Sequence, residues 1–240
     1  MSWSLVQSAS ARVTTSGGQT TVTATFGSAV TAGDLITVQV VNYSSGGMSV
    51  QDNINGAAYA QGILAGSTAS QAGIYWYVPP IGGSSFAVTL TTSGNTPGAI
   101  IIREWSGPAG TIAVTGTPTG AVASNVVSIA SSPISVTGPA LAIACVADVA
   151  AITGITPGTG WTLGTNVAWN NNVNVGIVDE YILNQSTGSI TPSMSWGVTS
   201  SSSAIAAMAF FTGSSALFSG TPFDGLGAGG PFFGNPLSHI

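Results

Sequence analysis

Short runs in which apolar and polar residues alternate recur along the chain, separated by clusters of Gly, Ser, Asn and Pro. The runs are rich in Val, Ile, Thr and aromatic residues and have the length of strands, as in "TTVTATF", "DLITVQVVNY", "AGIYWYV", "SFAVTLTT" and "GAIIIREW". Helical spacing is rarely sustained, because Gly or β-branched residues interrupt almost every candidate segment. The pattern therefore predicts an all-β fold, an antiparallel β-sandwich of jelly-roll-like character.

The strand pattern of the first half of the chain returns in the second half. "DLITVQVV" at residues 34–41 matches "ALAIACVA" at 140–147, and "GAIIIREWSG" at 98–107 matches "SAIAAMAFFTG" at 203–213. The alanines of the last segment would allow a helix, but its place in the repeat favours a strand. We therefore predict an internally duplicated sandwich.

The repeat divides the chain into two similar β-sandwich halves, residues 1–110 and 111–213. They form either two sandwiches in tandem or one duplicated set of strands around a shared core, and the absence of a charged or Pro-rich linker favours close packing. Residues 214–240 depart from the pattern and are predicted to be an irregular arm, because their Gly and Pro residues block a strand ladder. This arm either packs on its own sandwich or docks on a partner through four apolar anchors, namely Phe218, Phe223, Phe232 and Phe233.

The succession "GDLITVQVV", "VQDNINGAAYAQ", "AGIYWYV", "FAVTLTT" and "IIREWSG" resembles a family of β-sandwich domains found in secreted bacterial proteins and phage structural proteins. Members of that family show a "GDLLVV" strand, a "VTDSxGNTY" turn and an "EYSG" strand. This chain has "EWSG" in place of "EYSG" and keeps Asp52, Asn53, Gly56 and Tyr59 of the turn. The resemblance covers residues 20–213 and implies binding or structural modules rather than enzymes. The arm lies outside the family pattern.

Charged residues make up 4% of the 240 residues, and the only positive side chains are Arg12 and Arg103. Nucleic-acid binding needs a surface of Lys and Arg, so we expect no nucleic-acid partner. No long apolar run and no basic cluster is present, so we expect no membrane insertion. So few like charges permit dense packing of copies, and we expect a homo-oligomer. The N-terminus lacks the pattern of a signal peptide. We expect a virion or extracellular surface, reached either after a signal has been removed or by another route such as lysis.

Candidate catalytic and metal-binding groups are sparse. His239 is the only histidine and lies in the arm, which argues against a Ser-His-acid triad. Asp179 and Glu180 are neighbours in a predicted strand, so their side chains point to opposite faces and cannot pair in a cleft. Asp52 lies in the oxygen-rich "QDNING" loop, but that loop lacks a second acid and an Asx turn explains it better. Cys145 is alone and is expected to be a small buried hydrophobe. We predict no enzymatic activity, metal or cofactor.

Arg103 and Glu104 stand side by side in the apolar run "PGAIIIREWSG". Strand alternation sends them to opposite faces, so we interpret them as two separate structural residues. A carboxylate that faces the core needs hydrogen-bonding partners, and backbone amides of a nearby turn are the candidates for Glu104. Arg103 is expected near Trp105 on an outer face. In the repeat the two charges match about Met208 and Ala209, so the second half has neither.

The aromatic residues suggest a second function. In "IYWY", alternation sends Tyr75 and Tyr77 to one face of a strand, and an exposed aromatic face suits stacking on sugars. The alternative is that the rings fill the core, as most Trp rings do. The residues predicted for glycan binding are Tyr75, Tyr77, Trp105, Trp169 and Asn171.

The sequence as a whole favours a non-enzymatic structural protein of a virion or extracellular assembly. Examples are a phage decoration, capsid-associated or tail-associated protein, attached by its arm to other subunits or to neighbouring copies. The alternative is a carbohydrate-binding or adhesion module that recognises a cell-surface glycan through exposed aromatic rings. A hydrolase accounts for little of the sequence.

Overall fold

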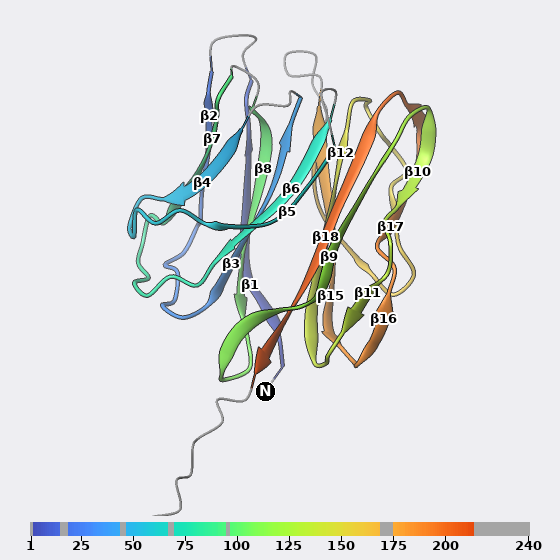
Figure 1. Cartoon of the computed structure of the whole chain (residues 1–240). Helices are drawn as coiled ribbons and strands as arrows, with labels where there is room; N and C mark the ends of the chain where they lie inside the picture. Colours follow the sequence, from blue (N-terminus) through green and yellow to red (C-terminus); the bar gives the residue numbers. More distant parts are fainter. Residues whose placement is uncertain are drawn as a thin grey trace, which may run out of the picture.

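The computed structural model describes residues 2–14, 19–43, 47–66, 70–94, 97–168 and 175–213, which form strands and turns without a helix (Figure 1). Every strand pair among them is antiparallel. The predicted all-β fold is confirmed. The alanine-rich segment is also a strand, β18 (Ser203–Gly213), as its place in the repeat predicted.

The first central sheet has the strand order β1-β8-β3-β6-β5. Its middle strand is buried along its whole length, because other layers cover both faces of the sheet. The sequence of that strand, "LITVQVVN", nevertheless alternates between apolar and polar residues from Ile36 to Val40. Its polar Thr37 and Gln39 are buried and bond to each other, with Gln39 Nε2 donating to the Thr37 hydroxyl at 3.1 Å. The five strands are β1 (Ser4–Arg12), β8 (Pro97–Ser106), β3 (Leu35–Asn42), β6 (Gln71–Tyr77) and β5 (Ala60–Gly66).

The second central sheet has the order β14-β15-β12-β18-β9. Its middle strand is also buried throughout. At one edge of this sheet, β9 pairs with β18 along most of its length. The strands besides β18 are β14 (Thr162–Val167), β15 (Gly176–Gln185), β12 (Ala140–Asp148) and β9 (Thr111–Ala123).

Smaller sheets cover the outer face of each central sheet. In the first of these sheets every second residue is buried, so one face packs inward and the other meets solvent. The first outer sheet comprises β2 (Thr21–Thr25), β7 (Ala87–Thr92) and β4 (Met48–Asp52). The second outer layer comprises β10 (Val126–Ala130), β17 (Ser193–Ser200) and β13 (Thr156–Pro157), with the ladder of β11 (Ile134–Val136) and β16 (Gly188–Ile190).

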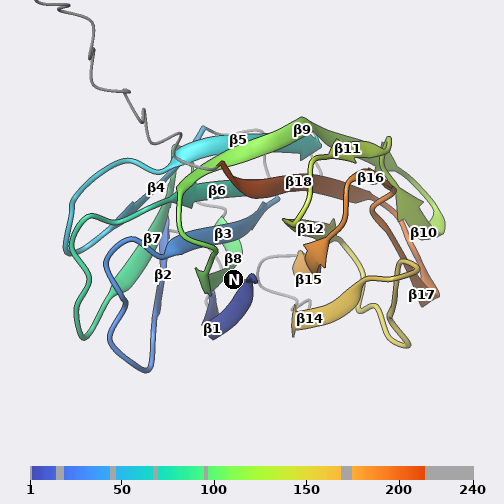
Figure 2. The same ribbon diagram turned by 90° about the horizontal axis from the view of Figure 1, so that it is seen from below.

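The sheets are arranged in four layers (Figure 2), and three regions of core lie between them. The central core lies between the two central sheets and joins Leu35, Ile74 and Ile101 to residues of the other sheet such as Ile143. A first lateral core lies between the first central and first outer sheets. A second lateral core, made of two clusters, lies between the second central sheet and its outer layer. The halves therefore have lateral cores of their own and share the central one.

The two halves have the same strand order. Read from the edge, β1-β8-β3-β6-β5 corresponds to β9-β18-β12-β15-β14. The register agrees as well, since Leu35 lies opposite Trp105 in one sheet and Leu141 lies opposite Phe210 in the other. Arg103 and Glu104 then correspond to Met208 and Ala209, as the repeat predicted. The boundary at residues 110 and 111 and an origin by duplication stay predictions.

The N-terminal strand holds the halves together along one edge. Trp3 is buried in the central core against Gly107, and its backbone N–H donates to Oδ1 of Asn184 at 2.7 Å. At the other end of β1, Arg12 Nη1 donates to the carbonyl of Ala168 at 3.0 Å. Strand β1 of the first sheet is therefore bonded to the second half at both of its ends.

Gly98→Ala is expected to reduce the free energy of unfolding by about 1–3 kcal/mol, as overpacking does. A Cβ at this position would meet Val175 of the second half and would lie 3.0 Å from Val41 Cγ2. Gly27→Ala is the matched control, since a Cβ there meets nothing within 4 Å. Chemical denaturation of both variants measures the difference. Equal stability of the two would show that the central sheets are not closely packed at residue 98.

Candidate functional site

A buried ion pair joins the two halves inside the central core. Arg103 on β8 donates from Nε to Asp179 Oδ2 at 2.6 Å and from Nη2 to Asp179 Oδ1 at 2.8 Å. Thr165 donates its backbone N–H to Asp179 Oδ1, and its hydroxyl oxygen accepts from Arg103 Nη2 at 3.1 Å. The guanidinium also lies 5.9 Å from the ring centroid of Trp105 and 5.2 Å from that of Tyr181.

The predicted position of Arg103 on an outer face is wrong, because the second half covers that face and leaves the side chain buried. The predicted proximity to Trp105 is confirmed. Asp179 and Glu180 do point to opposite faces of β15, since Asp179 reaches the central core and Glu180 the second lateral one.

Glu104 lies on the opposite face of β8 from Arg103, as predicted. Its Oε1 accepts the backbone N–H of Thr31 at 2.7 Å and its Oε2 accepts Gln7 Nε2 at 2.6 Å. The prediction that turn amides hold this carboxylate is therefore confirmed. Burial, followed by the charge of Glu104, raises the pKa of the neighbouring Asp34 to about 6.

Glu180 and Asp148 are buried carboxyl groups with raised pKa values. Burial raises the pKa of Glu180 to about 7, although its oxygens accept the backbone N–H groups of Gly158 at 2.8 Å and Ser193 at 3.2 Å. Burial likewise raises the pKa of Asp148 to about 6, against the opposing effect of its hydrogen bond from Ser200. Both groups serve to hold loops of the second half.

Asp52 and Cys145 have the structural roles that were predicted. Asp52 Oδ1 accepts the backbone N–H groups of Ile54 at 2.9 Å and Asn55 at 2.5 Å, which is an Asx turn. Cys145 is buried in the central core, where burial raises the pKa of its thiol above the ordinary range.

The charged residues are distributed in the reverse of the usual way, with most of them inside. Eight charged side chains fall within the described ranges, and six of these are buried. Arg12 is exposed and Asp34 is half-buried, so the described surface has almost no charge. The six buried residues are Asp52, Arg103, Glu104, Asp148, Asp179 and Glu180.

Hydroxyl groups cover the solvent face of the first outer sheet. Thr23 and Thr89 face each other across β2 and β7 with their oxygens 2.8 Å apart, and Gln51 follows on β4. Thr21 and Thr91 form the next cross-strand pair. This face therefore offers a regular array of hydroxyls without charge.

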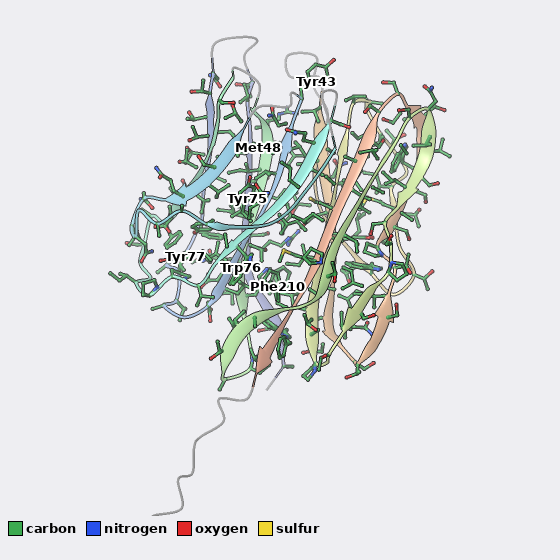
Figure 3. The ribbon with its side chains drawn as sticks, viewed as in Figure 1. Tyr43, Met48, Tyr75, Trp76, Tyr77 and Phe210 are labelled. Carbon is green, nitrogen blue, oxygen red and sulfur yellow. The ribbon has the colours of Figure 1, made fainter. Side chains whose placement is uncertain are left out.

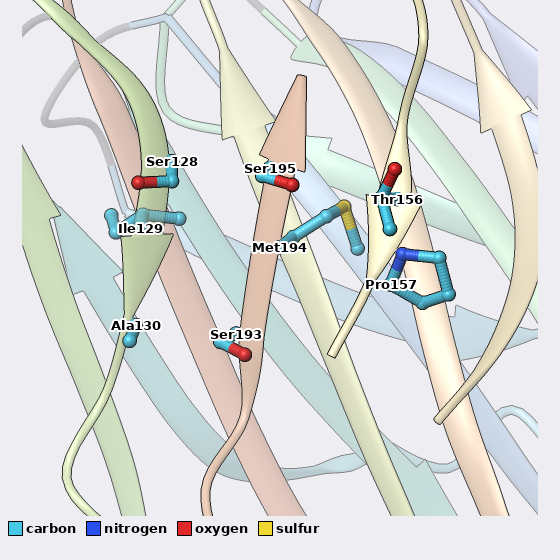
Figure 4. Close-up of a pocket in the computed structure, with 8 residues that line it drawn as sticks. All are labelled: Ser128, Ile129, Ala130, Thr156, Pro157, Ser193, Met194 and Ser195. Atoms are coloured by element: carbon cyan, nitrogen blue, oxygen red, sulfur yellow. The ribbon is translucent and has the colours of Figure 1, made fainter. Parts of the chain in front are cut away.

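The second outer layer carries a similar face with a shallow pocket of about 220 Å³ (Figure 4). Hydroxyls of Ser128, Ser195 and Thr156 surround it, while Ile129 and Met194 are buried beneath in the second lateral core. Both outer layers of the molecule thus present Ser and Thr hydroxyls, and the second also exposes Val127 on β10 and Val198 on β17.

Of the residues predicted for glycan binding, Tyr75 and Trp105 are buried and present no ring to a sugar. Tyr75 donates its hydroxyl to Gln61 Oε1 at 2.9 Å, and Trp105 Nε1 donates to Thr37 at 2.9 Å. Tyr77 is half-buried. The prediction that alternation separates Tyr75 and Tyr77 from Trp76 is confirmed, but both faces of β6 are covered, so neither is an exposed aromatic face (Figure 3).

Two further pockets lie elsewhere on the molecule. One of about 380 Å³ is lined by polar groups that include Gln185 and Thr191, but its Trp161 is only 6% exposed. The other, of about 510 Å³, is largely apolar and lies where β6 ends and β9 begins; Trp76, Tyr77 and Ile112 are among its walls. No pattern in the sequence indicates either pocket, since each combines residues from separate segments of the chain.

Several predicted site residues lie outside the described residues, namely Trp169, Asn171, Phe218, Phe223, Phe232 and Phe233. Within the described part of the chain, no group of three or more His, Cys, Asp or Glu side chains is placed to hold a metal ion. The same part contains no helix long and apolar enough to cross a membrane.

No protein-family model and no curated protein matches the chain. A similar solved structure is the X-ray structure of Melon necrotic spot virus, with 11% sequence identity and a TM-score of 0.23 over 86% of this chain and 96% of that chain. We draw no conclusion about this chain from a similarity with so low a TM-score. The resemblance to sandwich domains of secreted bacterial and phage proteins stays a prediction, while the all-β sandwich fold that it implies is observed.

Arg103→Met is expected to lower the free energy of unfolding by about 3–5 kcal/mol, because it leaves the Asp179 carboxylate buried without its partner. Adding Asp179→Asn should recover most of the loss, since the amide oxygen still accepts from Thr165. Arg12→Met makes the same chemical change at the exposed arginine and should cost only about 1 kcal/mol, the loss of its single hydrogen bond to Ala168. Urea denaturation checks all three, and a small effect at residue 103 would contradict the structural role of the pair.

The stability of the protein is expected to fall as pH rises from about 4.5 to 7. A carboxyl group whose pKa is raised by folding keeps its proton in the folded state after the unfolded chain has lost it, so folding is favoured most at the acid end of this range. Glu180 contributes on the order of 3 kcal/mol to this difference. Thermal unfolding between pH 4.5 and 8 should therefore give a falling Tm. Glu180→Gln should flatten the curve and Arg12→Gln should not; parallel curves for both would contradict the assignment.

Proposed function

We propose that this chain is a non-enzymatic structural subunit of a virion or extracellular assembly, packed against copies of itself or other subunits. The observation that carries the proposal is the distribution of charge. Six of the eight charged side chains in the described ranges are buried, and the two outer faces present Ser and Thr.

Surface charge normally keeps proteins soluble and apart, and an uncharged surface permits close association. Hydroxyl groups keep such a surface hydrated, and they can also form hydrogen bonds with the hydroxyl and backbone groups of a neighbouring subunit. The cross-strand pair of Thr23 and Thr89 already shows two of these oxygens at hydrogen-bond distance within one face. Such contacts do not involve ion pairs, so their strength should depend little on salt.

The arrangement of the acids supports a role without catalysis. The carboxylate oxygens of three buried acids accept hydrogen bonds from groups inside the protein; these acids are Glu104, Asp179 and Glu180. They belong to different cores and do not converge on one pocket. A hydrolytic pair of carboxylates needs the opposite arrangement.

The arm of residues 214–240 supplies the attachment in this proposal. Its phenylalanines are apolar anchors and its glycines let the segment follow a groove on another subunit, as in a phage decoration, capsid-associated or tail-associated protein. A cell-surface glycan remains an alternative partner only through Tyr77, Trp169 and Asn171. The burial of Tyr75 and Trp105 favours the structural role.

The full-length chain is expected to form oligomers or larger particles in sedimentation velocity at micromolar concentration, with little change between 50 mM and 1 M NaCl. Replacing the four arm phenylalanines by Ser should shift the distribution to the monomer. The reason is that the anchors are lost while the folded halves are untouched.

Near-UV circular dichroism provides the control, since the variant should keep the spectrum of the parent chain. A monomeric parent chain at all concentrations would contradict self-assembly. Unchanged assembly of the variant would contradict the role of the arm.

A further inference from the structure

The largely apolar pocket between the ends of the two central sheets has rigid walls. Trp76 packs edge to face on Phe210 with ring centroids 5.6 Å apart (Figure 3), and the ring of Tyr77 packs at a tilt against Tyr59 with centroids 5.1 Å apart. Val78 and Ile112 pack at the margin of the central core. Because these side chains pack against the protein behind them, the hollow of about 510 Å³ is already formed, and its size suits a bulky apolar group.

The chemistry of the pocket selects an uncharged occupant. The walls are two aromatic and two aliphatic side chains, together with Thr111 and the glycines at 33 and 110. Trp76, Tyr77, Val78 and Ile112 are all half-buried, so apolar surface remains for a ligand to cover. An aromatic ring would gain both burial and edge contacts with Trp76.

The described chain ends at the rim of this pocket. Strand β18 stops at Gly213, which pairs with Thr111 on β9. The carbonyl of Gly213 is so close to Gly110 that a Cβ there would collide with it. Residues 214–240 therefore leave the described structure beside two of the residues that line the pocket.

The first large apolar residues beyond this point are Leu217 and Phe218. Five residues of extended chain span at most roughly 17 Å, which is enough to reach the pocket and short enough to keep the ring near it. Phe232 and Phe233 would need a much longer loop to close, at a larger entropic cost. The local concentration of Phe218 at its own pocket also exceeds that of any residue from another copy in dilute solution.

We propose that the apolar pocket formed by Trp76, Tyr77, Val78 and Ile112 is the binding site for the Phe218 side chain of the same chain. This contact fixes the start of the arm at the end of the central core. This contact adds a detail to the proposed function. It rests on that function only in one respect, namely that Phe223, Phe232 and Phe233 stay free to bind a neighbouring subunit.

A disulfide trap in the full-length chain tests the contact. Thr111→Cys puts a thiol on the exposed rim of the pocket, and Ser219→Cys puts one next to Phe218. Oxidation should give an intramolecular disulfide in the monomer, detected by non-reducing electrophoresis and by the cross-linked peptide in mass spectrometry. Cys145 is buried and stays unmodified.

The rate of trapping separates binding from mere tethering. Phe218→Ala in the double-cysteine background should slow disulfide formation about tenfold or more, whereas Phe223→Ala should not. In the pocket, Ile112→Ser should slow it similarly. Val122→Ser is the matched control on the same strand, where the side chain is 63% exposed and far from the pocket in β9.

Equal rates for Phe218→Ala and Phe223→Ala would overturn the proposal, as would the absence of any trapped product. A covalent dimer in place of the intramolecular disulfide would also overturn it, because the occupant would then come from a second copy. The trap is read on the monomer at low concentration, so its failure leaves the assembly of the parent chain untouched. A loss of assembly with normal trapping would conversely count against the proposed function alone.

Discussion

The central core must hold a guanidinium and a carboxylate between two sheets that are covered on both faces, and this constraint determines how the halves fit together. Arg103 and Asp179 come from different sheets and meet through two hydrogen bonds. Contacts among Ile, Ala and Val tolerate small offsets, whereas a bidentate pair is satisfied in one relative position. The pair therefore sets the register of the two sheets, while the apolar contacts of the central core supply most of the stabilising free energy.

The other buried acids follow from the same need to satisfy charge inside a layered protein. Glu104 and Glu180 each face a lateral core and accept backbone N–H groups of the turns that pass over it. Each acid thus fastens a connection to a central sheet. Because these acids are buried, the described surface carries few charges. Its polar character comes mainly from the hydroxyl groups of Ser and Thr.

Alternation along the strands predicted much of this arrangement from the sequence. It separated Arg103 from Glu104 and Asp179 from Glu180, and the cost of a buried carboxylate predicted the amide partner of Glu104. It could not tell that both faces of β8 are covered, since period 2 only distinguishes the faces and the second half covers the one that carries Arg103. For the same reason Tyr75 and Trp105 are buried. The partner of Arg103 and the apolar pocket depend on contacts between the halves, which no local pattern encodes.

The two halves share a strand order but not the residues that join them. The place of Arg103 is taken by Met208 in the second half, and the place of Asp179 is taken by Ile74 in the first. Each half therefore carries one member of the ion pair. Two copies of one half, facing each other in this manner, would bury a charge against an apolar side chain, which is strongly unfavourable. The central interface is thus complementary between unlike surfaces, so it selects the pairing of the first half with the second over the pairing of either half with itself.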